Sequence, residues 1–235
     1  MEKKDIDGIV LTKYYCAYIR DLDMAVLSDL HIGYEEVMAQ KGLFLPKFQK
    51  KRIINVLENI IDNIRPSRIL VDGDFKHEFS GNVKQEWDEI IEIIEFIKER
   101  ADLIVVRGNH DNFLKNILKK YNIPLHRSYR EGKYTFNHGD KEIEYDGFLI
   151  MGHEHPSIKI RDPTGGIITI PSFLYNEKIL VLPSPSIYSS GSDILAGDIL
   201  SPILKKEDPY SFNALGIDDK IGLLDIGNLR NLITF

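Results

Sequence analysis

Apolar residues in the first half of the chain alternate between short runs of strand length and longer segments with helical spacing. The short runs predict strands over residues 14–19, 24–28, 69–71 and 103–106. The longer segments, in which isoleucine and leucine recur on one face, predict helices over residues 46–64 and 85–100. The first two strands are expected to form a hairpin, and the alternation that follows favours a parallel sheet with right-handed crossovers.

The second half of the chain has a different pattern, with short apolar runs and no strong helix between them. These runs predict strands over residues 134–136, 148–151, 158–160, 167–170, 179–182 and 221–224. We expect antiparallel pairing here, because parallel strands normally need a helical crossover. Two mixed sheets packed face to face and flanked by helices accommodate both halves. Residues 183–209, rich in Ser, Gly and Pro, predict an ordered loop or lid.

Length and composition predict one globular domain over residues 1–235. Apolar residues make up 43% and charged residues 28%, which excludes a disordered, collagen-like or disulfide-stapled chain. No apolar run approaches the roughly 18 residues that span a bilayer, so we expect no membrane partner. The N-terminus lacks the apolar core of a signal peptide, and the single Cys16 fits a reducing compartment, so we expect a cytoplasmic protein. The net charge of −6 disfavours a protein that holds nucleic acid mainly by electrostatics.

Five short polar motifs, each directly after a strand-like run, carry the candidate chemistry. They are Asp29-Leu30-His31, Gly73-Asp74-Phe75-Lys76-His77, Gly108-Asn109-His110-Asp111, His138-Gly139-Asp140 and Gly152-His153-Glu154-His155. Because an α/β fold presents its ligand crevice at the ends of its strands, these motifs can converge at one edge. Carboxylate, amide and imidazole groups without a thiolate suit Mn²⁺, Fe, Zn²⁺ or Ni²⁺.

The motifs supply more candidate ligands than one ion can use. The seven candidates are Asp29, His31, Asp74, Asn109, His138, His153 and His155. Two ions about 3.5–4 Å apart that share a carboxylate accommodate them. Asp74 is the best candidate for the shared group, because it follows a strand and Gly73 frees the turn. His126 is interpreted as a surface residue, whereas His77 is left open between support of a ligand and contact with substrate.

The order of these motifs resembles the calcineurin-like metallophosphoesterase superfamily. Residues Leu27–Glu35 and Gly73–Phe79 also resemble a narrower group, the small archaeal phosphoesterases related to the SbcD nuclease subunit. The resemblance implies an α/β protein with a four-layer α/β/β/α sandwich and a metal-dependent phosphoesterase activity. Phosphodiesters are favoured over monoesters as substrates, because the sequence contains no recognisable charged clamp for a terminal phosphate.

The resemblance also implies a role for each candidate residue. Asp29, His31 and His155 would hold the first ion. Asn109, His138 and His153 would hold the second ion, and Asp74 would bridge the two, with Mn²⁺ expected and Fe, Ni²⁺ or Zn²⁺ left open. A hydroxide that bridges the ions would attack phosphorus. His110 would act at the leaving group, with Asp111 orienting its ring.

The physiological substrate stays open. Related nucleases carry DNA-gripping domains after the core, and only about 80 residues follow His155. The basic residues at 47 and 50–52 are interpreted as a solvated helix face, and no basic groove or aromatic platform supports processive nuclease action. A nuclease of a repair complex and a non-catalytic scaffold of the same fold are therefore the alternatives, and a homodimer is left open. The loop with Tyr188 and Tyr210 is left open between part of a substrate wall and a surface loop.

Overall fold

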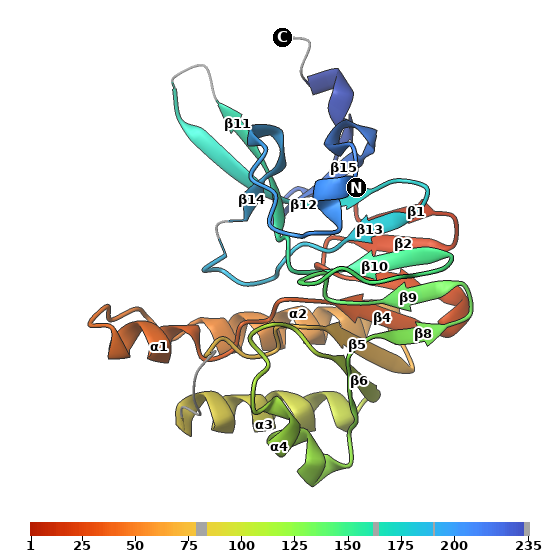
Figure 1. Ribbon diagram of the computed structural model, residues 1–235. Coiled ribbons are helices and arrows are strands. Elements are labelled where there is room, and N and C mark those ends of the chain that lie inside the picture. Colours follow the sequence, from red (N-terminus) through yellow and green to blue (C-terminus); the bar gives the residue numbers. More distant parts are fainter. Residues whose placement is uncertain (79–83, 162–164, 190, 233–235) are drawn as a thin grey trace.

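Two β-sheets form the framework of the computed structural model, which describes residues 1–78, 84–161, 165–189 and 191–232 (Figure 1). Phe79, the last residue of the second family-like motif, lies outside this description. The first sheet follows chain order and contains β1 (Lys3–Ile6), β2 (Ile9–Thr12), β3 (Ala17–Ile19), β4 (Met24–Leu27), β5 (Arg68–Asp72), β6 (Asp102–Val106) and β7 (Leu125–His126). Strands β1 to β4 pair antiparallel, and β4 to β7 pair parallel, as the alternation of strands and helices predicts.

Four α-helices lie on the face of the first sheet that is turned away from the second sheet (Figure 1). They are α1 (Tyr34–Gln40), α2 (Gln49–Ile64), α3 (Lys84–Lys98) and α4 (Leu114–Leu118). Helix α2 begins three residues later than the sequence predicts, because Glu35 of α1 caps it from outside. Its Oε1 accepts the backbone N–H groups of Phe48 and Gln49 at 2.9 and 2.7 Å. The helix ends at Ile64, as predicted.

The second sheet continues the chain from β8 to β16. Its strands are β8 (Tyr129–Glu131), β9 (Tyr134–Phe136), β10 (Phe148–Met151), β11 (Pro156–Arg161), β12 (Ile167–Tyr175), β13 (Ile179–Val181), β14 (Ser192–Asp193), β15 (Asn213–Asp218) and β16 (Gly222–Asn228). The expectation of antiparallel pairing is wrong for β10, which pairs parallel with both β9 and β13. Non-helical connections make these crossovers, including residues 137–147 and the β11–β12 hairpin. The parallel pairing directs the ends of β9 and β10, and the motifs that follow them, to one edge.

Side chains of the second sheet alternate between two hydrophobic cores. Ile150 and Leu180 belong to the large core that also contains the first sheet and its helices, whereas Leu149, Met151 and Val181 face a second core. Short 3₁₀ turns cover that outer face: η3 (Ile194–Ala196), η4 (Leu204–Lys206), η5 (Pro209–Ser211) and η6 (Leu229–Leu232). The remaining 3₁₀ turns are η1 (Arg20–Leu22) and η2 (Lys119–Tyr121). The four-layer α/β/β/α arrangement is confirmed, with 3₁₀ turns as its outer layer within the described residues.

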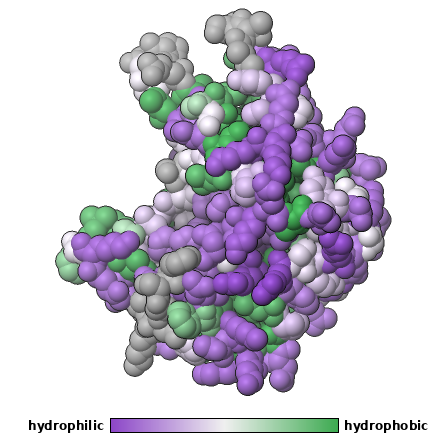
Figure 2. Space-filling view, viewed as in Figure 1, coloured by the Kyte–Doolittle hydropathy of each residue, from purple (hydrophilic) through white to green (hydrophobic). Residues whose placement is uncertain are grey.

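The surface agrees with the high charged fraction of the sequence. The face in Figure 2 is mainly hydrophilic, and hydrophobic residues gather beside α1, where Leu43 and Phe44 are exposed. The basic group at the start of α2 is largely neutralised, because Lys50 pairs with Glu92 at 2.7 Å and Arg52 pairs with Asp219 at 2.9 Å. These pairs agree with a solvated helix face. No helix within the described ranges has the length and apolar character needed to cross a membrane.

Candidate metal centre

Five loops that follow β4, β5, β6, β9 and β10 bring the predicted motifs to one edge of the two sheets. Five of the seven predicted ligands have a positive φ angle, which is rare for residues other than glycine: Asp29, His31, Asp74, His153 and His155. Such conformations cluster at functional sites, where the surrounding structure holds them in place. In the Asp-x-His motif they bring both side chains to one cluster, whereas His153 and His155 of the His-x-His motif belong to two neighbouring clusters.

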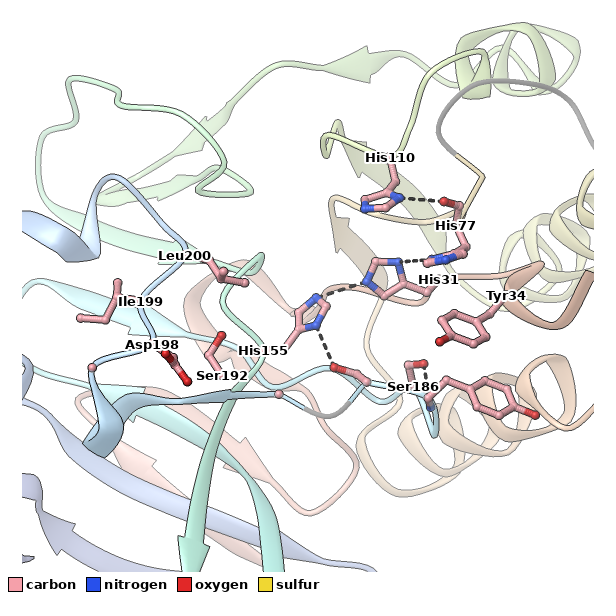
Figure 3. Close-up of a pocket in the computed structure, with 14 residues that line it drawn as sticks. His31, Tyr34, His77, His110, His155, Ser186, Ser192, Asp198, Ile199 and Leu200 are labelled. Atoms are coloured by element: carbon pink, nitrogen blue, oxygen red, sulfur yellow. Dashed lines mark hydrogen bonds between the residues drawn. The ribbon is translucent and has the colours of Figure 1, made fainter. Parts of the chain in front are cut away.

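The first cluster contains Asp29, His31 and His155, the same three residues that the family resemblance assigns to one ion. One ligand atom from each lies within 4.8 Å of the other two. His155 Nε2 lies 2.9 Å from Asp29 Oδ1. The same nitrogen lies 3.2 Å from His31 Nε2 (Figure 3). The opposite nitrogen, His155 Nδ1, lies 2.8 Å from Ser189 Oγ, so Nε2 faces the cluster.

The second cluster contains Asp74, His138 and His153, again within 4.8 Å of one another. His138 Nε2 lies 3.3 Å from Asp74 Oδ2 and 3.1 Å from Asn109 Oδ1, which places the predicted amide ligand in the same cluster. His138 Nδ1 lies 3.0 Å from the carbonyl oxygen of Asp72, so this ring also directs Nε2 inward. All seven predicted ligands therefore lie in, or directly contact, one of the two clusters.

Glycines let these groups approach closely. A Cβ atom on Gly108 would collide with the Asp74 carboxylate, and one on Gly152 would lie 2.6 Å from Asp29 Oδ2. The backbone N–H of His153 reaches the same Asp29 oxygen at 3.1 Å. The glycines of the Gly-Asn-His-Asp and Gly-His-x-His motifs are therefore required by packing against the two carboxylates.

Buried charge dominates the electrostatics of both clusters. Burial raises the pKa of the Asp29 carboxyl, but the adjacent His155 and His138 rings outweigh this and lower it to about 2. Burial likewise opposes ionisation of Asp74, yet the nearby His138 holds its pKa below the usual range. Within the described residues, no Lys or Arg pairs with either carboxylate; their charged partners are histidines. Two buried anions surrounded by imidazole nitrogens and an amide oxygen fit divalent cations.

Burial favours the neutral form of His31, whereas the adjacent carboxylates of Asp74 and Asp29 raise the pKa of His138 and His155 against the effect of burial. Burial, reinforced by the neighbouring His155, lowers the pKa of His31 to about 3. The pKa of His77 is lowered to about 4 by burial and by its neighbour His110. Neutral imidazoles offer a lone pair to a cation, whereas imidazolium groups do not.

A third histidine group extends the first cluster toward solvent. His77 Nδ1 lies 3.4 Å from His31 Nδ1, and His110 Nδ1 lies 2.7 Å from the carbonyl oxygen of His77 (Figure 3). His31, His77 and His110 together meet the same 4.8 Å criterion for a possible ion site. These rings line a cavity of about 640 Å³ that opens beside the first cluster.

The expected contact between Asp111 and the His110 ring is corrected by this geometry. The buried Asp111 carboxylate accepts the backbone N–H groups of Gly108 and Lys76, at 2.8 and 3.3 Å. The His77 carbonyl, and not Asp111, faces His110 Nδ1. Burial and the nearby Asp74 charge raise the pKa of Asp111 to about 7. Asp111 therefore holds the two loops together rather than orienting the imidazole.

The loop over residues 183–209 supplies part of the cavity wall. Tyr188 stacks on Tyr34 with 4.7 Å between ring centroids, and both line the cavity. The buried Glu154 accepts the N–H groups of Leu200 and Ser201, which fixes the other end of the loop to the Gly-His-x-His motif. Tyr210 is not among the residues that line this cavity and packs against the second core, so only Tyr188 of the two tyrosines borders the cavity.

Sequence reasoning gave no role to two serines of this loop. Ser184 Oγ donates to the carbonyl oxygen of Asp29 at 2.8 Å, and Ser189 Oγ contacts His155 as described above. Serines are frequent in loops, and no local pattern marks these two as partners of residues far away in sequence. Tyr34, by contrast, lies three residues after His31, so its position next to that motif is a local signal.

Replacing Ser189 by alanine is expected to weaken binding of Mn²⁺ about 10-fold, because His155 loses the partner that fixes its ring. Isothermal titration of the metal-free protein measures the affinity. The matched control is Ser211→Ala, which removes a hydroxyl that bonds the Asp208 carbonyl, away from the clusters. Equal Mn²⁺ affinity in Ser189→Ala and the unmodified protein would contradict the positioning role.

A solved structure shows the same fold. The crystal structure of Pseudomonas putida nuclease MPE has a TM-score of 0.65 and 17% sequence identity, covering 92% of this chain and 96% of that chain. The phosphoesterase YfcE from E. coli has a TM-score of 0.39 and 17% identity, over 85% of this chain and 90% of that one, which is too low for a structural argument. No curated protein matches the sequence.

The family model for calcineurin-like phosphoesterases matches residues 22–209. This match includes all five polar motifs and both ligand clusters, and it extends over most of the chain. The chain belongs to the calcineurin-like phosphoesterase family.

Proposed function

We propose that this protein hydrolyses phosphodiesters with two divalent metal ions. The observation that carries the proposal is the presence of two separate ligand clusters, each with a carboxylate and two histidines, at one edge of the sheets. Asp29, His31 and His155 would hold one ion. His138, His153 and Asn109 would hold the other, with Asp74 between them. When bound, the two ions would lower the pKa of water and neutralise charge on the phosphoryl oxygens.

His110 is the residue proposed to act at the leaving group. Its side chain is 27% exposed, whereas that of Asp74 is 3% exposed, so the imidazole borders both the clusters and the open cavity. A carbonyl oxygen can only accept a hydrogen bond, so the His77 carbonyl fixes the proton on His110 Nδ1. His110 Nε2, 4.0 Å from Asp74 Oδ2, is then the nitrogen that exchanges a proton with the departing oxygen.

A diester fits the surroundings of the clusters better than a monoester does. The 640 Å³ cavity contains no lysine or arginine among its described lining residues, so it favours an uncharged substituent of a diester. A second cavity of about 480 Å³ lies beside the second cluster and includes Asn109. Space on two sides of the clusters accommodates substituents on both sides of a phosphodiester.

Hydrolysis of bis-p-nitrophenyl phosphate tests the proposal. We expect release of p-nitrophenolate with Mn²⁺, less than one hundredth of that rate in chelator, and slower turnover of p-nitrophenyl phosphate. Parallel reactions with Fe²⁺, Ni²⁺ and Zn²⁺ test the proposal that Mn²⁺ is the working ion. Faster hydrolysis of the monoester would overturn the diester assignment. Inactivity toward both esters, with two ions bound, would favour a non-catalytic scaffold of the same fold.

A further inference from the structure

The 480 Å³ cavity beside the second cluster has a different character from the first. Basic and amide side chains dominate its wall, among them Arg107, Asn112, Arg127, Asn137 and Lys141. It also contains Asn109, so it continues directly from the second cluster. Asp140 and Glu142 border it as well, but Glu142 is already paired with Lys206 at 2.6 Å.

Adjacent strands of the first sheet hold the two arginines side by side. Arg107 directly follows β6, and its backbone N–H donates to the carbonyl oxygen of His126 in β7 at 2.8 Å. Arg127 directly follows β7, and its carbonyl accepts the Asn137 side-chain N–H at 3.1 Å. Both guanidinium groups therefore extend from the same sheet edge that carries the ligand clusters.

Among the residues that the structure describes, no acidic group neutralises the charge of these two arginines. Several other arginines lie within 2.9 Å of an acidic oxygen: Arg20, Arg52, Arg68, Arg100 and Arg230. Arg107 and Arg127 pair with no acidic residue of the described chain, and both are exposed. Arg107 Nη2 donates to Asn112 Oδ1 at 2.8 Å, a neutral partner that holds the guanidinium and leaves other N–H groups available.

We propose that Arg107 and Arg127 form a subsite for a second phosphate group of the substrate, the phosphate adjacent to the scissile one in a single nucleic-acid strand. This inference rests on the proposed phosphodiesterase function and extends it to a substrate class. Guanidinium groups bind phosphate through two parallel hydrogen bonds, and the position beside Asn109 puts the subsite next to the reacting group.

The 640 Å³ cavity beside the first cluster favours a nucleotide strand as the source of that phosphate. Its wall contains the stacked pair of Tyr34 and Tyr188, and aromatic side chains of this kind contact nucleobases. A strand therefore places a base in one cavity and a flanking phosphate in the other.

Binding of a labelled pentathymidylate, measured by fluorescence anisotropy in chelator to prevent cleavage, tests the subsite. We expect Arg107→Gln and Arg127→Gln each to weaken binding about 5-fold or more. Each should also make the negative slope of log affinity against log salt concentration shallower by about 0.7, the value for one phosphate contact on a single strand. Arg107→Lys and Arg127→Lys should retain most of the salt slope. Arg65→Gln, which changes an exposed arginine at the C-cap of α2, before β5, is the matched control.

Hydrolysis of bis-p-nitrophenyl phosphate, which has one phosphate, should stay within 2-fold in both glutamine variants. Failure of the unmodified protein to hydrolyse it would overturn the proposed function, while the binding measurement would still decide the subsite. Unchanged pentathymidylate affinity and salt slope in the double variant would overturn the subsite. ADP and inorganic pyrophosphate serve as competitors. Trithymidylate is the reference competitor. If ADP or pyrophosphate displaces pentathymidylate at the same concentration as trithymidylate, and the arginine variants weaken all three competitors equally, the second phosphate belongs to a diphosphate. The assignment to a nucleic-acid strand would then be wrong.

Discussion

Replacing Asp74 by asparagine is expected to lower kcat/KM for a phosphodiester by about 1,000-fold or more. The Asp74 carboxylate is buried between the clusters, with Oδ2 3.3 Å from His138 Nε2 and Oδ1 accepting the N–H of His110 at 2.9 Å. An amide of the same shape removes the negative charge that both ions would share. A loss of 1,000-fold corresponds to about 4 kcal/mol of transition-state stabilisation. Steady-state kinetics and elemental analysis of bound metal measure the two consequences.

The metal content separates this role from a general defect in folding. We expect Asp74→Asn to retain at most one ion per chain, with a cooperative thermal transition still present. Asp102→Asn changes an exposed carboxylate at the opposite end of β6 and should keep both ions and full activity. Two tightly bound ions in Asp74→Asn, together with turnover within a few-fold of the unmodified protein, would show that Asp74 does not bridge.

The position of the candidate site could be predicted because its residues directly follow strands. Apolar runs marked β4, β5 and β6, and parallel pairing of these strands places their carboxyl ends at one edge. That the motifs after these strands meet can therefore be predicted without knowing how the side chains pack. The family and the two-sheet fold could also be predicted, because both depend on local sequence patterns. The family match and the solved structure confirm them.

Features that depend on contacts between distant residues could not be predicted. Glu35 caps α2 from a different helix, whereas local preference alone predicts that α2 starts at Pro46. The parallel pairing of β10 was missed because its crossovers contain no helix. The Asp111 carboxylate lies beside His110 in sequence, yet it bonds the backbone of Lys76, 35 residues away.

The loop over residues 183–209 illustrates the same limit at the site itself. Ser184 reaches the Asp29 carbonyl across 155 positions, and Ser189 reaches His155 across 34. No residue next to either serine in the sequence marks it as a partner of the ligand clusters. The composition of the loop predicted order, which its hydrogen bonds to the clusters explain, but the identity of the contacting residues required the structure.

Replacing His110 by alanine is expected to lower kcat for a diester with a poor leaving group by between about 100- and 10,000-fold, the range for loss of a general acid. Among the candidate site residues, His110 alone combines a ring held by a backbone carbonyl with an Nε2 atom that is not assigned to an ion. Metal content should be unchanged, because both ligand clusters remain complete. Rates for a series of diesters with different leaving groups provide the measurement.

The leaving-group series distinguishes proton donation from a structural effect of the same substitution. A departing p-nitrophenolate needs little protonation, so His110→Ala should reduce its release far less than it reduces release of an alkyl alcohol. A structural defect would slow both substrates by the same factor. His126→Ala is the matched control, because His126 lies in β7, contacts Tyr129 and belongs to neither cluster. Equal losses for good and poor leaving groups, or a loss of bound metal, would show that His110 supports the site without donating a proton.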